Sequence, residues 1–201
     1  MISFLKKYNI ELLSVIMFAM TVLTVFLPDP SIIRKFLAVY MMLYVLHEWE
    51  ENRSPGGFTK IMEKIIGKTF TEDAKAMSHI PVFILLLAIL LIPYALDSVT
   101  VLFLIPVFLG IFEGFVHTMG VKASKAEKFY TPGMVTAYCL LAFSAFVIYY
   151  LASHGMASGK EFEMGFVCMF ASFACMQNRV LAINGVKYKD MIQDMKSRLR
   201  G

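Results

Sequence analysis

The sequence predicts an all-α integral membrane protein, a compact bundle of six transmembrane helices with an interfacial amphipathic helix between the second and the third. Of the 201 residues 58% are hydrophobic, and the mean hydropathy is +0.67. Charged residues make up 17% of the chain and gather in short blocks between long apolar runs. Soluble domains carry about 25% charged residues and mix them more evenly with apolar ones. These observations place the chain in a lipid bilayer.

Each long apolar run is a candidate span, because a helix of about 20 residues crosses the roughly 30 Å hydrocarbon core. The runs cover residues 10–27, 32–51, 79–96, 99–120, 131–153 and 162–180. The small-residue cleavage pattern of a secretory signal does not follow the first run, so that run is interpreted as a span. Six spans leave no sizeable soluble domain, and residues 1–201 are therefore predicted to form one transmembrane domain.

Positive charges fall mainly on one side of the predicted spans. With the amino terminus in the cytoplasm, 16 of the 19 Lys and Arg residues lie inside, and only Arg34, Lys35 and Lys160 lie outside. Cytoplasmic loops of membrane proteins carry such an excess. We therefore expect both termini to be cytoplasmic and the protein to be a multi-pass protein of the cytoplasmic membrane.

Residues 57–68, between the second and third spans, are predicted to form a helix in the headgroup layer. Its apolar residues recur at helical spacing, and charged residues cover the other side. The apolar residues are Phe58, Ile61, Met62, Ile65 and Ile66. An ordinary cytosolic loop helix is the alternative. The basic tail, residues 186–201, either binds the membrane surface in the same way or is solvated in the cytosol.

Several classes of function have no motif in this chain. The sequence contains no nucleotide-binding loop and no dinucleotide fingerprint. The net charge of +4 is explained by membrane topology, so no nucleic-acid partner is expected. The three cysteines lack Cys-x-x-Cys spacing and are expected to be reduced and structural.

The end of the second span carries the most informative residues, His47, Glu50 and Glu51. Only eleven uncharged residues, 36–46, lie between the charged pair Arg34 and Lys35 and His47. As a helix they extend roughly 16 Å, about half of the hydrocarbon core, so a segment that crosses the membrane must bring its polar end into it. On a helix the three residues lie at about 0°, 300° and 40°, on one face, whereas Glu48 points elsewhere.

The fourth span has a similar pair, Glu113 and His117, which share a face because they are four residues apart. The predicted topology brings this pair to the depth of the first group. Carboxylates at this depth normally face the bundle interior with a partner. Nitrogen and carboxylate ligands without thiolates suit a divalent Zn, Mn or Fe ion. The predicted metal site consists of His47, Glu50, Glu51, Glu113 and His117.

Other interpretations of these residues stay open. Glu50 and Glu51 could simply mark where the second span leaves the membrane, and the polar groups could share protons or hydrogen bonds without a metal. Tyr40 and Tyr44 continue the same helical stripe and are predicted to bind substrate. The pattern leaves undecided whether His79 or Asn178 joins the site.

The order of these residues resembles the HXXEE family of bacterial polytopic membrane proteins, named for the pattern His47-x-x-Glu50-Glu51. Glu113 and His117, followed by Tyr130-Thr131-Pro132-Gly133-Met134-Val135-Thr136, resemble a second block of that family. The resemblance runs roughly from the second to the fifth span. It implies a small polytopic helical protein with this site, and it implies no substrate.

Three functions fit the pattern. We expect a metal-dependent or acid/base membrane enzyme that acts on a lipid-like or hydrophobic small molecule, with Glu50 or Glu51 as the catalytic base. A metal-ion or proton transporter is the alternative, although the outer halves of the second and fourth spans offer few polar residues for a pathway. A non-catalytic accessory protein, in which the cluster only fixes helix packing, is the third.

Overall fold

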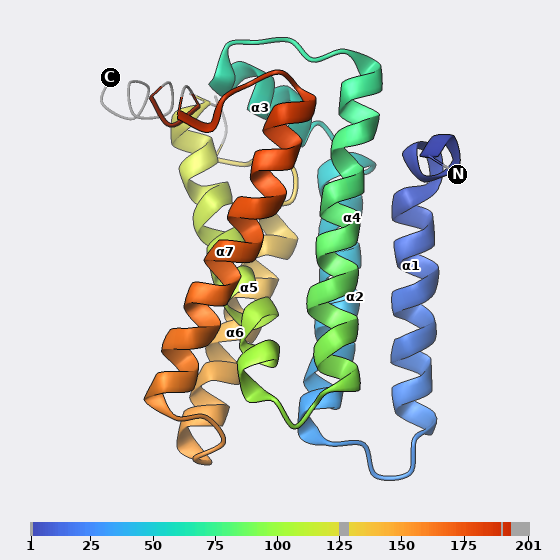
Figure 1. The fold of residues 1–201 in the computed structure, drawn as a ribbon, viewed down its shortest axis with the longest axis vertical. Helices are drawn as coiled ribbons and strands as arrows, with labels where there is room; N and C mark the ends of the chain where they lie inside the picture. The colour runs from blue at the N-terminus through green and yellow to red at the C-terminus, as the bar shows by residue number, and fades with distance from the viewer. Residues whose placement is uncertain (1, 125–128, 190, 194–201) are drawn as a thin grey trace.

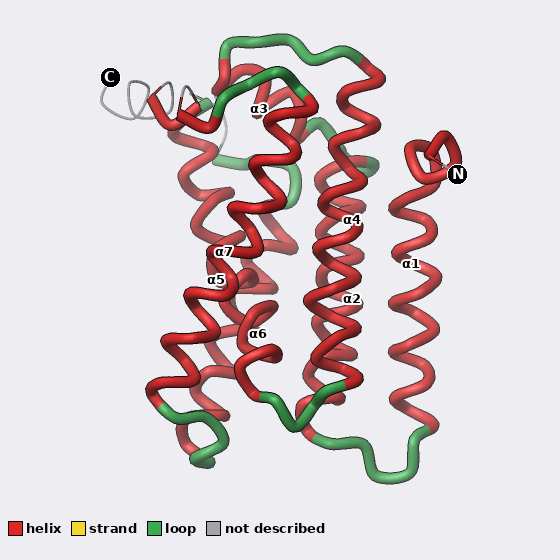
Figure 2. Tube along the Cα trace, in the orientation of Figure 1, coloured by secondary structure: helices red, strands yellow, loops and turns green. Residues whose placement is uncertain are grey.

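The computed structural model describes residues 2–124, 129–189 and 191–193. In this part of the chain the secondary structure is helical, with turns and loops between the helices and no strands (Figure 2). The helices are α1 (Ile2–Phe26), α2 (Ile32–Asn52), α3 (Phe58–Ile66), α4 (Glu72–Ala95), α5 (Thr100–Ala123), α6 (Met134–Ser153) and α7 (Gly159–Ile183).

Five of the described helices, α1, α4, α5, α6 and α7, are long and apolar enough to cross a membrane, which makes this a multi-pass membrane protein. Helix α2 has similar length but is more charged, with Arg34 and Lys35 at one end and Glu48, Glu50 and Glu51 at the other. It lies alongside α1, α4 and α6 in the bundle (Figure 1).

Helices α4 and α7 begin ahead of the spans expected from hydropathy, because capping residues precede their first turns. Helix α4 begins at Glu72, since the side chain of Thr71 accepts a hydrogen bond from the Ala74 amide. Helix α7 begins at Gly159, because Ser158 and Glu161 form a reciprocal capping box. Hydropathy finds the apolar part of a helix, whereas capping residues set its first turn.

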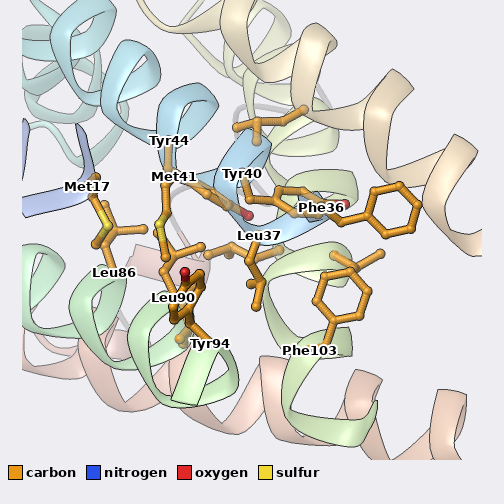
Figure 3. Packing of buried hydrophobic residues seen from close by; sticks show 14 of the residues in the cluster. Met17, Phe36, Leu37, Tyr40, Met41, Tyr44, Leu86, Leu90, Tyr94 and Phe103 are labelled. Atoms are coloured by element: carbon orange, nitrogen blue, oxygen red, sulfur yellow. The ribbon is translucent and has the colours of Figure 1, made fainter. Parts of the chain in front are cut away.

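The core of the bundle is formed by side chains that meet between α2, α4 and α5. Tyr40, Tyr44, Leu90 and Phe103 are almost fully buried there (Figure 3). Helix α6 packs closely on α5 because Gly110 and Gly114 face it: a Cβ atom at Gly110 would collide with Ser144 Oγ, and one at Gly114 would lie 3.0 Å from Leu141 Cβ.

Helix α3 crosses the end of the bundle at which α1 begins and α7 ends (Figure 1). Its apolar residues pack against the protein. Ile65 is buried, and Phe58, Met62 and Ile66 line a cavity beneath the helix. An interfacial position for α3 in the headgroup layer stays a prediction.

Part of the predicted basic tail lies outside the described residues, as do Lys125 and Lys128. In the described part, Met191 is buried and its sulfur lies 3.9 Å from Gln177 Nε2. The chain after α7 therefore turns back against that helix.

Candidate functional site

Four polar side chains meet at the end of the bundle that α3 covers. His47 and Glu51 come from α2, and Glu113 and His117 come from α5. His47 Nε2 lies 3.6 Å from Glu51 Oε1 and 3.8 Å from Glu113 Oε2. His117 Nε2 lies 3.1 Å from Glu51 Oε1 and 4.0 Å from Glu113 Oε2. Both imidazoles therefore turn the same ring nitrogen toward both carboxylates.

The hydrogen bonds of His47 fix its tautomer. Its Nδ1 lies 3.1 Å from the Gly133 carbonyl oxygen and 3.0 Å from Thr136 Oγ1. A carbonyl oxygen only accepts, so the proton of the neutral ring resides on Nδ1. The lone pair of Nε2 consequently points into the cluster, as in a metal-ligating histidine.

His117, on α5, also has its Nδ1 beside a threonine hydroxyl. Its ring is completely buried, and Nδ1 lies 3.0 Å from Thr131 Oγ1. Its Nε2 is buried and lacks a hydrogen-bond partner among the described residues, since the contact with Glu51 does not have hydrogen-bond geometry. A buried polar atom without a hydrogen-bond partner lowers the stability of the fold by about 1–3 kcal/mol, and a ligand bound to this nitrogen would remove that cost.

The loop that enters α6 is shaped to fit beside the two histidines. Gly133 has a φ of +92° and precedes the first residue of the helix. A Cβ atom there would lie 2.6 Å from Glu51 Cγ, 2.6 Å from His117 Cε1 and 3.0 Å from His47 Cε1. Glycine is needed at this position both for the backbone conformation and for the space.

Glu50 lies apart from the cluster, at the amino-terminal end of α6. Its carboxylate accepts hydrogen bonds from the Val135 amide at 3.2 Å, the Thr136 amide at 2.9 Å and the Thr136 hydroxyl at 2.6 Å. The Tyr130 hydroxyl donates a further one at 3.0 Å. Burial, together with this bond to the Glu50 carboxylate, raises the pKa of Tyr130 to about 12, so Tyr130 is a neutral donor.

Glu50 thus caps α6, and it touches His47 only through the Thr136 hydroxyl. That hydroxyl donates to Glu50, so it accepts from His47 Nδ1. The predicted ligand set is therefore divided by the structure, which brings His47, Glu51, Glu113 and His117 together and places Glu50 behind them. Suitable ligand atoms of His47, Glu113 and His117 lie within 4.8 Å of one another, which is close enough to hold one metal ion.

A cavity of about 190 Å³ adjoins the cluster. Its wall includes His47, Glu51 and Glu113, and apolar side chains from α3, α4, α5 and α7 form most of the rest. Glu48 also lines it, although helical geometry predicts that this residue points elsewhere. Glu48 reaches the cavity because α3 and α4 pack against α2 and enclose more of its surface than the face that carries His47 and Glu51.

The other predicted residues divide between the core and the cavity. Tyr40 and Tyr44 do not line the cavity; the Tyr40 hydroxyl lies 2.9 Å from Ser144 Oγ, and the Tyr44 hydroxyl donates to the Pro106 carbonyl at 2.7 Å. His79 lines the cavity, whereas Asn178 is exposed and does not. The spacing of His and Glu residues did not predict a role for Thr131, Gly133 and Thr136. All three lie in the Tyr130–Thr136 segment that resembles the second block of the HXXEE family.

Residues 38–148 match the family model described as a protein of unknown function with HXXEE motif. The chain belongs to the HXXEE family. The matched segment of this HXXEE protein contains the four clustered side chains, Glu50 and the loop that holds the histidines. Comparison with curated proteins and with solved structures gives no match.

Proposed function

We propose that this HXXEE protein is a metal-dependent membrane enzyme that acts on a hydrophobic small molecule. The observation that carries the proposal is the unpartnered, fully buried Nε2 of His117, which faces His47 Nε2 and two carboxylates beside an apolar cavity. His47, Glu113 and His117 hold the ion in this proposal.

The distances support a metal site of this composition. Ligand atoms about 2.1 Å from a tetrahedral Zn ion lie about 3.4 Å from one another. Glu113 Oε2 lies 3.8 Å and 4.0 Å from the two histidine nitrogens, so small side-chain shifts suffice to bind a cation. Two imidazoles and one carboxylate suit Zn, Fe or Mn, and three protein ligands leave a position open, as in catalytic sites.

Glu51 is the proposed acid/base. Its Oε1 lies 3.6 Å and 3.1 Å from the two histidine nitrogens, and its side chain lines the cavity. A metal ion held by these residues would supply Lewis acidity and would lower the pKa of a water molecule bound to it. A carboxylate at this distance can take a proton from that water or return one to a substrate.

The cavity supports a membrane enzyme over a transporter. Toward the other end of the bundle the interior is filled by Tyr44, Leu90, Phe103 and Leu104, each with an exposed fraction of 1% or less. The site is therefore reached from the end that α3 covers. We further infer that α2 is a sixth span, with both termini and the site on the cytoplasmic side, because the excess of Lys and Arg lies at that end.

Elemental analysis of detergent-purified protein tests the proposal. After exposure to Zn, Fe or Mn and removal of loose ions, wild-type protein is expected to hold about one ion per chain. Glu113→Gln and His117→Asn each remove a ligand and are expected to lose it. Glu51→Gln keeps the three ligands and is expected to retain the ion.

The control is His154→Asn, which changes an exposed histidine bonded to Tyr150 at the opposite end of the bundle. It should bind metal like wild type. Folded wild-type protein that takes up none of the three metals, or equal metal content in all variants, would refute the proposed site.

A further inference from the structure

Three acidic side chains line the cavity next to the cluster. They are Glu48, Glu51 and Glu113, and neither Lys nor Arg is among its described lining residues. With all three ionised, a divalent cation in the proposed site would offset two of the three charges. The cavity would still be negative, which disfavours a fatty acid or a phosphate ester and favours a cation.

Glu48 is a buried carboxylate with an incomplete set of partners. Only 7% of the residue is exposed. Asn52 Nδ2 donates to its Oε2 at 3.2 Å, and no described residue hydrogen-bonds its Oε1. A buried charge without a partner is costly, so a carboxylate on a cavity wall favours a ligand that brings a positive charge or several donors.

The remaining wall is suited to hydrocarbon. The cavity is lined by Phe58 and Met62 of α3, Val82 of α4, and Phe173 and Met176 of α7. A volume of about 190 Å³ is many times the ~10–15 Å³ that one water molecule requires, so the space admits a short hydrocarbon segment.

We propose that the cavity binds an amphiphilic amine. Its ammonium group binds the Glu48 carboxylate, and its hydrocarbon part lies between α3, α4 and α7. An ammonium group has three donors and no acceptor, which matches a carboxylate whose Oε1 has no donor among the described residues. As a substrate class this inference rests on the proposed function; as a binding site it stands on Glu48, which is not a proposed metal ligand.

Binding of three probes with the same chain and different head groups tests the proposal. Octylamine, octanol and octanoate are titrated into wild-type protein, Glu48→Gln and Glu163→Gln in a non-ionic detergent. Affinity is measured by calorimetry and by the shift of the unfolding midpoint. Glu163→Gln is the control, because it removes one exposed carboxylate at the opposite end of the bundle.

Octylamine is expected to bind wild type and Glu163→Gln more tightly than the other two probes. Glu48→Gln, nearly identical in shape, is expected to weaken octylamine binding about tenfold or more, since it removes a charge-assisted hydrogen bond. Equal binding of the three head groups to wild type overturns the inference, and so does undiminished octylamine binding by Glu48→Gln.

Metal content measured on the same samples separates this inference from the proposed function. Glu48→Gln should retain metal while it loses the amine. Metal-free wild type that still selects octylamine refutes the metal enzyme and supports the amine site, whereas metal-loaded wild type that binds the three probes alike refutes only the amine site.

Discussion

Single residues behind the cluster determine which ring nitrogen of His47 and of His117 faces the two carboxylates. Both rings are held through Nδ1 by the segment that leads into α6, His47 by Gly133 and Thr136, and His117 by Thr131. Residues that hydrogen-bond the other ring nitrogen of a ligating histidine orient the ring and tune its affinity for metal. The segment that holds the rings is therefore as much a part of the site as the rings themselves.

Gly133→Ala should disrupt the cluster. The added Cβ would lie 2.6 Å from both Glu51 Cγ and His117 Cε1, at a φ of +92°. Gly155→Ala is the matched control, because Gly155 also has positive φ, +62°, but its Cβ would meet nothing within 4 Å. We expect Gly155→Ala to cost about 1 kcal/mol of unfolding free energy. Gly133→Ala should cost clearly more and lower metal content; equal effects of the two would show that the space at Gly133 is not required.

Thr136→Val should weaken metal binding without unfolding the protein. The change removes the hydroxyl that links His47 Nδ1 to Glu50 and leaves a side chain of the same shape. Loss of a residue that hydrogen-bonds a metal ligand typically lowers metal affinity about 10–100-fold. Competition with a chromophoric chelator measures this affinity. Thr118→Val, which removes a hydroxyl bonded to Gly114 and Tyr138 outside the cluster, should leave it unchanged.

At the scale of elements, α2, α5 and α6 build the cluster and α3 closes it. Helices α2 and α5 supply the polar side chains, and the amino-terminal end of α6 is held by Glu50 of α2. A carboxylate at a helix amino terminus is stabilised by the free amides and by the helix dipole. Helix α3 is amphipathic and covers the cavity with its apolar side.

Lys68 fastens the end of α3 to the end of α7. Its ammonium group donates to the Asn184 carbonyl at 2.8 Å and to the Gly185 carbonyl at 2.9 Å. Lys68→Met should therefore increase hydrogen exchange of the α3 amides by about tenfold, as expected for loss of a charge-assisted bond. Lys60→Met changes an exposed lysine of the same helix and should leave exchange unchanged. Identical exchange in the two variants would show that Lys68 does not hold α3 closed.

For the whole molecule, the arrangement of the helices agrees with six crossings. The amino terminus, α3 and the end of α7 lie at one end of the bundle, and the loops α1–α2, α4–α5 and α6–α7 lie at the other (Figure 1). Most of the described Lys and Arg residues lie at the first end, which is predicted to face the cytoplasm.

Cysteine labelling of intact cells checks this topology. In a background with Cys139, Cys168 and Cys175 changed to Ser, we introduce Asp29→Cys in the α1–α2 loop or Ser54→Cys in the α2–α3 loop. A membrane-impermeant maleimide is expected to label the first variant in intact cells and the second only after permeabilisation. Labelling of both in intact cells would mean that α2 does not cross the membrane.

Much of this protein could be predicted from the sequence, because its signals are local. Apolar runs identify the helices of the bundle, and i, i+4 spacing places Glu113 beside His117. Helical geometry likewise groups His47 with Glu51. Each of these properties depends on residues within one helix, where the period of 3.6 residues relates sequence directly to space.

Only the tertiary structure decided which polar residues meet. Glu50 and Glu51 are neighbours on α2, yet Glu51 meets α5 whereas Glu50 meets the amino terminus of α6. Tyr40 and Tyr44 share the stripe of the cluster but are buried in the core, and Glu48 lies off that stripe but lines the cavity. The spacing of residues on one helix fixes their direction around its axis, but the neighbouring helices determine what each direction meets.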